Sequence, residues 1–290
     1  MANHHGTILD LRGQHDDPHV DLRPSIVRGL QQTQPELPSI VMWDEVGLNC
    51  YEELCHHPAY YLRRAEVEIL SQHATSIAQT IPANAIVLEL GCGSLTKTCL
   101  LLSALAAQDK PIAYYALDLV ASTLEDSLQS LRTAFPAEGL VQVSGAVTFL
   151  TSCRRACSDV PCSFIVGVDG CRDEERLMAA YNMSQGPFHA FMCNGLAAVN
   201  RLPWGTVFEP GRWQVRGGFD PITKMMRFGH MTVQPVTVQL DGCSITFGQG
   251  TWIKQLVSGK WTTDDVREVA ESAGFELSRC WADETGSYGE

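Results

Sequence analysis

Apolar residues first recur with a regular period between residues 60 and 82. Steps of three and four separate five of them: Val67, Leu70, Ala74, Ile77 and Ile81. This spacing places them on one face of a helix, which Pro82 ends. Residues 85–90 then form an almost continuous apolar run, which predicts a buried parallel strand. A turn containing two glycines follows this strand, and a helix is predicted over residues 96–107.

A second unit of the same kind comes next along the chain. Residues 111–118 predict another buried strand, and this one ends in an acid. Apolar residues on one helical face then precede Pro136: Leu124, Leu128, Leu131 and Phe135. The order strand, turn, helix, strand, helix predicts an α/β fold with a doubly wound sheet and right-handed crossovers.

The last third of the chain follows a different pattern. Residues 213–247 alternate apolar and polar side chains in short runs, which predicts a small antiparallel addition that could cover a ligand-binding site. Thr262 begins a capping sequence for one more helix, whose apolar face is made of four residues: Val266, Val269, Ala270 and Ala273.

Composition excludes several classes of protein. The net charge of −12 argues against nucleic acid or an anionic membrane as the main partner, because both need a basic surface. The most hydrophobic stretch, residues 99–107, is too short to span a bilayer. Eleven scattered cysteines without a secretory signal predict reduced thiols and a cytoplasmic location. Neither these cysteines nor the histidines of the first twenty residues have the spacing of a metal site, so no metal is expected.

The candidate ligand site lies where the first strand ends, because open α/β sheets bind ligands beyond the carboxyl ends of their strands. Glu89, Gly91 and Gly93 stand there, and Asp118 ends the next strand, where an acid can accept hydrogen bonds from a ribose. These residues predict a nucleoside ligand. Thr96 occupies the position where a dinucleotide fingerprint has its third glycine, so the turn resembles that of S-adenosylmethionine (SAM) enzymes more than that of NAD enzymes. A purely structural tight turn is the alternative.

Several separate motifs, in the same order, resemble the histidine-specific SAM-dependent methyltransferase family. This family includes the histidine Nα-methyltransferases of ergothioneine synthesis and the fungal dimethylallyltryptophan N-methyltransferases, and the fungal branch is the nearer one. The motifs are Ile8-Leu-Asp-Leu-Arg12, Trp43-Asp-Glu-Val-Gly-Leu48, Tyr60-Tyr-Leu-Arg-Arg-Ala-Glu66, Leu88 to Thr98, Tyr114-Tyr-Ala-Leu-Asp118, Val166-Gly-Val-Asp-Gly-Cys171, Ala180-Tyr-Asn182, Cys193-Asn-Gly-Leu196 and Asp283 to Gly289.

The resemblance implies a role for individual residues. Gly91 would approach SAM with its backbone, Lys97 would face the methionyl end, and Asp118 would bind the ribose. Tyr60 and Tyr181 match tyrosines that hold the amino-acid substrate in the family.

Two further residues complete the implied substrate side. Trp43 stands where the family has a tyrosine beside the reacting amine, and its ring can stabilise a methylated, cationic nitrogen. Ser258 matches a serine of the family's substrate site. Core packing is the alternative interpretation for each aromatic residue. No metal and no nucleophilic side chain are needed for the implied reaction, and the sequence does not identify a catalytic proton acceptor.

Three departures from the family pattern qualify the resemblance. Compared with the family pattern, the sequence between residues 149 and 164 is too short for a strand and its helix, about 30 residues for such a unit, where the family carries a substrate-holding asparagine. Either the segment near Cys153 substitutes for the strand or the sheet is rearranged. Residues 145–147 replace polar groups near the adenine. The acid with which the family binds imidazole falls on Leu256, or in a shifted alignment on Gln255 or Val257. Histidine is therefore disfavoured as a substrate relative to tryptophan- or tyrosine-derived amines.

We therefore expect an α/β class I SAM-methyltransferase fold with a doubly wound sheet and a small α+β substrate-covering domain. The expected organisation is residues 1–60 for substrate-side helices, 61–185 for the SAM-binding core, 186–270 for the substrate cover and 271–290 for the return to the core sheet. The expected activity is SAM-dependent N-methylation of an amino acid or amino-acid-derived metabolite in fungal secondary metabolism. A non-catalytic relative that acts as a binding or regulatory partner is the main alternative, and an NAD-linked oxidoreductase is a more distant one. The expected partner is a small-molecule amine.

Overall fold

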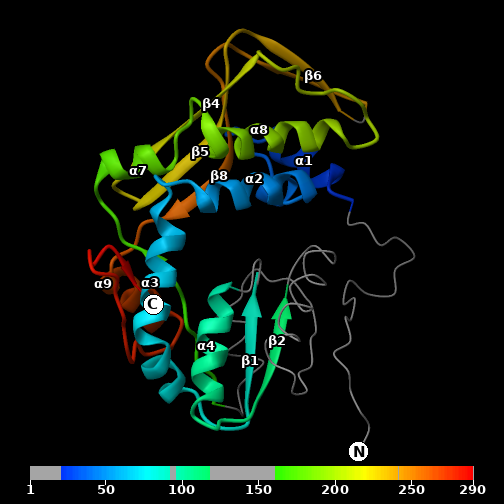
Figure 1. Cartoon of the computed structure of the whole chain (residues 1–290). Helices are drawn as coiled ribbons and strands as arrows, with labels where there is room; N and C mark the ends of the chain where they lie inside the picture. The colour runs from blue at the N-terminus through cyan, green and yellow to red at the C-terminus, as the bar shows by residue number, and fades with distance from the viewer. Residues whose placement is uncertain (1–20, 92–95, 118–160, 241, 290) are drawn as a thin grey trace, which may run out of the picture. The chain divides into compact units, whose positions relative to one another are not determined.

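The computed structural model describes residues 21–91, 96–117, 161–240 and 242–289 (Figure 1). The chain divides into two compact units, and each is made of segments that are separate in the sequence. Apart from residues 1–18, which lie outside the described part, unit 1 comprises Arg64–Gly167 and Thr263–Glu290, and unit 2 comprises His19–Arg63 and Val168–Thr262. The expected division by role, at residues 60, 185 and 270, stays a prediction.

Unit 1 contains the parallel strand pair that the sequence predicts. β1 and β2 run in register from Ala85 beside Ile112 to Leu90 beside Leu117. The helices predicted before β1 and after it are present, as is the helix near the C-terminus. The elements are α3 (Tyr61–Thr80, whose first three residues belong to unit 2), β1 (Ala85–Leu90), α4 (Thr96–Ala106), β2 (Ile112–Leu117), α9 (Thr263–Ser272) and β9 (Tyr288–Gly289).

β1 differs from the expected fully buried strand. Its residues alternate between half-buried and exposed, and Ile86 and Leu88 are 73% and 51% exposed. Ala85, Val87 and Glu89 form the covered face, where α4 contacts β1 through Thr98 and Glu89. The helix that the sequence predicts at residues 124–135 lies outside the described residues, so burial on both faces is not found in the part that is described.

Unit 2 is built of helices around an antiparallel sheet. The strands β4, β5 and β8 pair side by side in that order, and β6 and β7 form a separate hairpin. The antiparallel addition predicted over residues 213–247 is therefore confirmed. The strands are β3 (Val168–Asp169), β4 (Trp213–Asp220), β5 (Met225–Thr232), β6 (Val236–Leu240), β7 (Cys243–Phe247) and β8 (Trp252–Gly259).

The helices of unit 2 bury one continuous apolar core. α8 is its centre, because it packs against α2, η1 and β4 and buries Phe188, Phe191, Met192 and Val199. The helices are α1 (Arg23–Leu30), η1 (Ser39–Met42), α2 (Glu45–His56), α7 (Glu174–Ala180) and α8 (Gly186–Asn200).

One glycine permits α8 to lie this close to β8. A Cβ atom on Gly195 would lie 2.1 Å from the side-chain amide nitrogen of Gln255, so any larger residue would displace that buried side chain.

None of the described helices is both long enough and apolar enough to cross a membrane.

Candidate functional site

The residues predicted to bind the cofactor follow β1 in unit 1. Gly91 has φ +70°, a conformation that costs an L-residue about 1–2 kcal/mol. Among the described residues, no atom lies within 4 Å of the place where a Cβ of Gly91 would stand. The backbone therefore favours glycine here, and no described neighbour crowds the position. Gly93 and Asp118 lie outside the described residues.

Glu89 ties together the elements around this turn. Its carboxylate accepts hydrogen bonds from the Thr98 hydroxyl of α4, at 2.7 Å, and from the Tyr114 hydroxyl of β2, at 2.5 Å. Burial raises the pKa of Glu89 above its ordinary value, although both hydroxyls act in the opposite direction. The acid therefore holds the end of β1 against α4 and β2 while it remains partly exposed.

Lys97 lies in the first turn of α4 and forms an ion pair within unit 1. Its ammonium forms a 2.6 Å ion pair with Glu66 of α3, and both side chains remain about a quarter exposed, at 30% and 22%. The first turn of α4 is thereby tied to α3.

The four residues predicted to bind the substrate all lie in unit 2, and the structure joins them into one series. Trp43 meets Tyr51 edge to face with ring centroids 5.1 Å apart, and Tyr51 meets Tyr60 at 6.5 Å. Tyr60 in turn meets Tyr181 at 5.9 Å and an interplanar angle of 85°. The Tyr181 hydroxyl lies 3.2 Å from the hydroxyl of Ser258. We call Trp43, Tyr51, Tyr60 and Tyr181 the aromatic series.

The charge state of the buried tyrosine in this series follows from its surroundings. Burial, together with the neighbouring phenols of Tyr51 and Tyr181, raises the pKa of Tyr60 well above its ordinary value. Its hydroxyl therefore stays protonated at neutral pH and acts as a hydrogen-bonding group, not as a base.

Trp43 owes its position to the carboxylate that follows it. Asp44 caps α2 by accepting a 2.9 Å hydrogen bond from the Gly47 backbone, and it also accepts one from Asn194 of α8 at 2.8 Å. Arg201 pairs with the second carboxylate oxygen. Burial raises the pKa of Asp44, but these three donors outweigh it, and the pKa lies below its ordinary value. The start of α2 is thereby fixed against α8, and Trp43 packs on Phe191.

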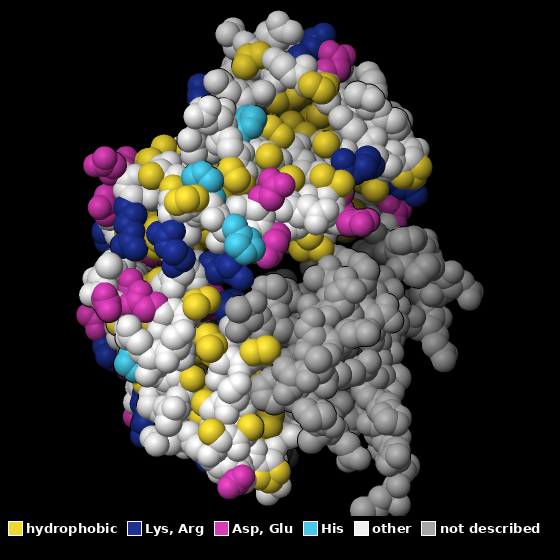
Figure 2. All heavy atoms as spheres, viewed as in Figure 1, with side chains coloured by type: hydrophobic (Ala, Val, Ile, Leu, Met, Phe, Trp, Pro, Cys, Tyr) yellow, Lys and Arg dark blue, Asp and Glu magenta, His cyan; other side chains and the backbone are white. Residues whose placement is uncertain are grey.

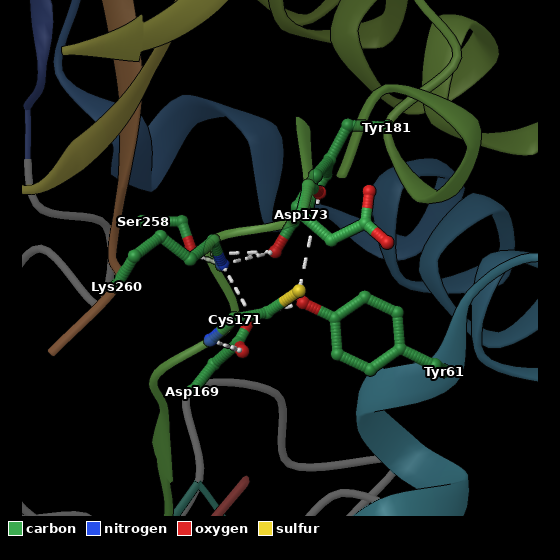
Figure 3. A network of polar contacts seen from close by, with 7 residues as sticks. All are labelled: Tyr61, Asp169, Cys171, Asp173, Tyr181, Ser258 and Lys260. Carbon is green, nitrogen blue, oxygen red and sulfur yellow. Dashed lines mark hydrogen bonds and ion pairs between the residues drawn. The ribbon is translucent and has the colours of Figure 1, made fainter. Parts of the chain in front are cut away.

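The polar end of the aromatic series is a buried network around Asp169 (Figure 3). Lys260, which is fully buried, donates to Asp169 at 2.7 Å, to Tyr181 at 3.0 Å and to Ser258 at 2.9 Å. Tyr61 donates to the same carboxylate at 2.6 Å. Burial and this carboxylate raise the pKa of Tyr61 above its ordinary value, so the phenol remains a donor.

Strand β8 carries Leu256 and Ser258, and Ser258 is one of the residues predicted to bind the substrate. Side chains two apart on a strand share a face, so Leu256 and Ser258 point the same way, whereas Val257 points to the opposite face. Val257 is exposed, and Gln255 is buried in a 2.7 Å hydrogen bond with His230. None of the three residues that can match the family's imidazole-binding acid is an acid, and Leu256, the one that shares a face with Ser258, is apolar.

Comparison with known proteins decides the family. The model of the histidine-specific, SAM-dependent methyltransferases matches residues 22–147 and 139–290, which is most of the chain. The chain belongs to this family. SAM is its cofactor, and the predicted α/β class I methyltransferase fold is confirmed.

Relatives in fungi indicate the reaction. The chain is 28% identical to the N-methyltransferase imqF of Aspergillus flavus, over 98% of this chain and 87% of the relative. It is 31% identical to the N-methyltransferase dtpB of the same fungus, over 92% and 87%. A 4-dimethylallyltryptophan N-methyltransferase, easF of Epichloe festucae var. lolii, is 39% identical over 43% of this chain and 36% of the relative. The family member described here is therefore a SAM-dependent N-methyltransferase.

The described residues around the turn fit SAM. SAM carries no phosphate, and among the described residues nothing lies within 4 Å of a Cβ placed on Gly91. Its positive sulfonium and amine suit the carboxylates of Glu89 and Glu66, and its carboxylate suits Lys97.

The alignment with one relative contains positions that this chain lacks. The alignment with imqF runs over 322 positions and this chain has 290 residues, so at least 32 positions (322 minus 290) have no counterpart here. The two matches to the family model overlap at residues 139–147, close to the gap predicted between residues 149 and 164. These residues, with 145–147 among them, lie outside the described part of the chain.

Sequence reasoning missed two members of the arrangement. Tyr51 joins Trp43 to Tyr60, and the available signal was an aromatic residue on the helix that separates them in sequence. Lys260 holds Tyr181 and Ser258, and the signal was its spacing of two from Ser258.

Proposed function

We propose that this enzyme transfers a methyl group from SAM to the amine of an aromatic amino acid or an amino-acid-derived metabolite. Tryptophan- and tyrosine-derived amines are the substrate class that we favour, and fungal secondary metabolism such as alkaloid biosynthesis is the setting. Support comes from relatives that are named N-methyltransferases in Aspergillus flavus and from one named for 4-dimethylallyltryptophan.

The aromatic series is the observation that carries this proposal. Tyr60 and Tyr181 are buried while Trp43 and Tyr51 are half-buried, so the series runs from the core of unit 2 toward its surface. Aromatic faces attract cations, and a methylated amine is a cation. Edge-to-face rings also suit an indole or phenol ring of the substrate. The same residues would bind both parts of an aromatic amino acid.

Leu256 argues for the substrate class. An imidazole N–H needs an acceptor, and Leu256 offers none on the face that it shares with Ser258. A ligand whose polar group finds no hydrogen-bond partner in a site binds there less well than a ligand without that group. An aromatic side chain without this requirement is the better match.

The reaction assigns limited tasks to the protein. Bound SAM supplies a methyl group activated by its positive sulfonium. The protein must hold the uncharged amine in line with that methyl group and keep water away. Tyr60, as a protonated phenol, and Asp169, whose carboxylate receives three donors, are poor acceptors for the amine proton. The amine is therefore expected to bind in its neutral form or to lose its proton to another group.

We assign the two tasks to the two units. Glu89, Gly91, Gly93, Lys97 and Asp118 would bind SAM in unit 1. Trp43, Tyr60, Tyr181 and Ser258, with Tyr51 added, would bind the amine in unit 2. No metal is assigned.

A small molecule is the expected partner. Acidic, basic and apolar side chains are interspersed on the face of the described residues that Figure 2 shows, and the net charge is −12. Both features suit a small substrate better than a nucleic acid. The eight cysteines in the described part of the chain are all free, which suits the proposed cytoplasmic location.

Methyl transfer from labelled SAM to a panel of tryptophan, 4-dimethylallyltryptophan, tyrosine and histidine tests the proposal. We expect methylation of an aromatic amine and little or none of histidine. Trp43→Leu should raise KM for that amine. Trp252→Leu, at the exposed first residue of β8, should not. Binding of S-adenosylhomocysteine without methylation of any panel member would contradict the substrate class.

A further inference from the structure

Lys260 is an ammonium group buried without any exposure to solvent. It has three protons to donate, and three acceptors surround it: an Asp169 oxygen at 2.7 Å, the Ser258 hydroxyl at 2.9 Å and the Tyr181 hydroxyl at 3.0 Å (Figure 3). The ammonium is therefore fully satisfied by the protein. It has no proton left for a ligand, so its effect on a ligand has to pass through its neighbours.

The lysine fixes the direction of two hydroxyl groups. An ammonium only donates, so Tyr181 and Ser258 must each accept a hydrogen bond from Lys260. Each hydroxyl keeps its own proton. The contact between the two, at 3.2 Å, uses at most one of these two protons. At least one O–H is left to donate elsewhere, and Ser258 is the half-exposed member of the pair.

Asp169 holds the lysine in place and balances its charge. One carboxylate oxygen accepts from Lys260 and from the Tyr61 hydroxyl, and the other accepts from the Cys171 backbone at 2.9 Å. The backbone of Asp169 in turn accepts from the Trp261 amide at 2.8 Å, next to Lys260 in sequence. The pair is thus anchored from several elements of unit 2.

We propose that Lys260, held by Asp169, is a positioning residue that makes the hydroxyl pair of Tyr181 and Ser258 a hydrogen-bond donor. The ligand group that meets this pair is then an acceptor oxygen, either a carboxylate or a hydroxyl. This inference rests on the proposed substrate site. The polar end of the substrate site would then select a ligand with an acceptor oxygen. While the Tyr181 and Ser258 protons point toward the ligand, these hydroxyls cannot accept a hydrogen bond from a ligand N–H group.

The variant for the test must avoid leaving a buried charge. Lys260→Met alone would strand the Asp169 carboxylate, which destabilises a protein strongly. Lys260→Met combined with Asp169→Asn removes both charges and keeps similar volumes, and it leaves the hydroxyl pair without its donor. Lys260→Gln combined with Asp169→Asn retains a donor in the form of an amide. The matched control is Lys254→Met with Glu36→Gln, which removes a 2.5 Å ion pair formed by Lys254 of β8, the strand that precedes Lys260.

Affinities measured by calorimetry in the presence of S-adenosylhomocysteine give the readout. Tryptophan and tryptamine differ only in the carboxylate, and tyrosine and phenylalanine differ only in the phenol hydroxyl. We expect the native protein to prefer one oxygen-bearing member by about tenfold, the size of one charge-assisted hydrogen bond. The Met/Asn variant should lose that preference, the Gln/Asn variant should keep part of it, and the control should keep all of it. A response in the comparison of tryptophan with tryptamine would identify the carboxylate as the acceptor, and a response in the comparison of tyrosine with phenylalanine would identify the phenol hydroxyl.

Ser258→Ala and Ser258→Thr keep the test decisive if a double variant does not fold. Ser258→Ala removes one acceptor of Lys260 but leaves its charge paired with Asp169, and only the threonine variant should retain the preference. No preference in the native protein, or one that the Met/Asn and Ser258→Ala variants keep, would overturn the positioning role. A native protein that binds S-adenosylhomocysteine and shows the preference, yet methylates no amine, would instead refute the proposed function.

Discussion

The Tyr61 hydroxyl donates a 2.6 Å hydrogen bond to the Asp169 oxygen that also accepts from Lys260. The two residues are 108 positions apart in sequence, and both are buried. Tyr61 is the first residue of α3, and Asp169 ends β3. The bond therefore ties the beginning of a long helix to the network that carries Tyr181 and Ser258.

Replacing this phenol should weaken the fold in a pH-dependent way. Tyr61→Phe removes a hydrogen bond to a charged group, so we expect a loss of about 2 kcal/mol in the free energy of unfolding near neutral pH. Because the folded state raises the pKa of Tyr61, its contribution is present below about pH 10, the ordinary tyrosine value, and is lost as the pH rises further. The stability gap between native protein and variant should therefore shrink above that pH.

Urea titrations at a series of pH values measure this gap. Tyr115→Phe is the matched control, since among the described residues no hydrogen bond is found for its hydroxyl, and it should change stability little at any pH. A gap for Tyr61→Phe that stays constant into the alkaline range would contradict the explanation.

Gly91 gives a prediction for the cofactor side. Gly91→Ala places a Cβ in the open space beside the turn and forces alanine to φ +70°. Gly211→Ala imposes the same strain at φ +82°, also in open space, in unit 2. Both variants should lose about 1 kcal/mol of stability. Only Gly91→Ala should weaken the binding of S-adenosylhomocysteine, with a Kd about tenfold higher in calorimetry. Equal affinities for both variants would remove Gly91 from the cofactor site.

Leu256 gives a prediction for substrate choice. Leu256→Glu restores an acid on the strand face of Ser258, where a carboxylate can accept from an imidazole N–H. The ratio of kcat/KM for histidine to that for tryptophan should rise by about tenfold or more. Val257→Glu puts the same acid on the opposite, exposed face and should leave the ratio unchanged. A ratio that does not respond to Leu256→Glu would show that this face does not meet the substrate side chain.

Local periodicity explains which parts of the fold the sequence predicts. α3, β1 and α4 were expected close to their observed bounds, because side-chain spacing and the flanking proline and glycines carry the signal within a few residues. The alternation of β4 to β7 is likewise a local signal. The motif resemblance predicts Trp43, Tyr60, Tyr181 and Ser258 as substrate residues. In the structure, contacts through Tyr51 connect all four.

Long-range contacts explain what the sequence does not reveal. Lysine is rarely buried, so the spacing of two between Ser258 and Lys260 does not by itself reveal that Lys260 is buried; its burial depends on Asp169, 91 residues away. Tyr51 looks like any aromatic residue of an amphipathic helix until Trp43 and Tyr60 are seen on either side of it. The burial of β1 alternates along a run that is apolar almost throughout, so hydropathy alone does not reveal which face is exposed.

His230 should limit the stability of the protein in acid. Burial lowers its pKa to about 4, against which the hydrogen bonds to Gln255 and the Met192 backbone act only in part, and the charge of His189 adds to the lowering. The folded protein thus keeps a neutral His230 between about pH 6.5 and pH 4, while the unfolded chain binds a proton. Stability should fall by about 3 kcal/mol as the pH decreases through this window.

The variant His230→Gln separates this effect from ordinary acid unfolding. It should be less stable than the native protein at neutral pH, because the packing on Gln255 changes, but it should lose less stability on going to about pH 4. His73→Gln, on the half-buried face of α3, should keep the steeper native slope. Since a proton taken up only by the unfolded state always lowers stability, a His230→Gln variant with the native slope would mean that His230 is protonated in the folded protein as well.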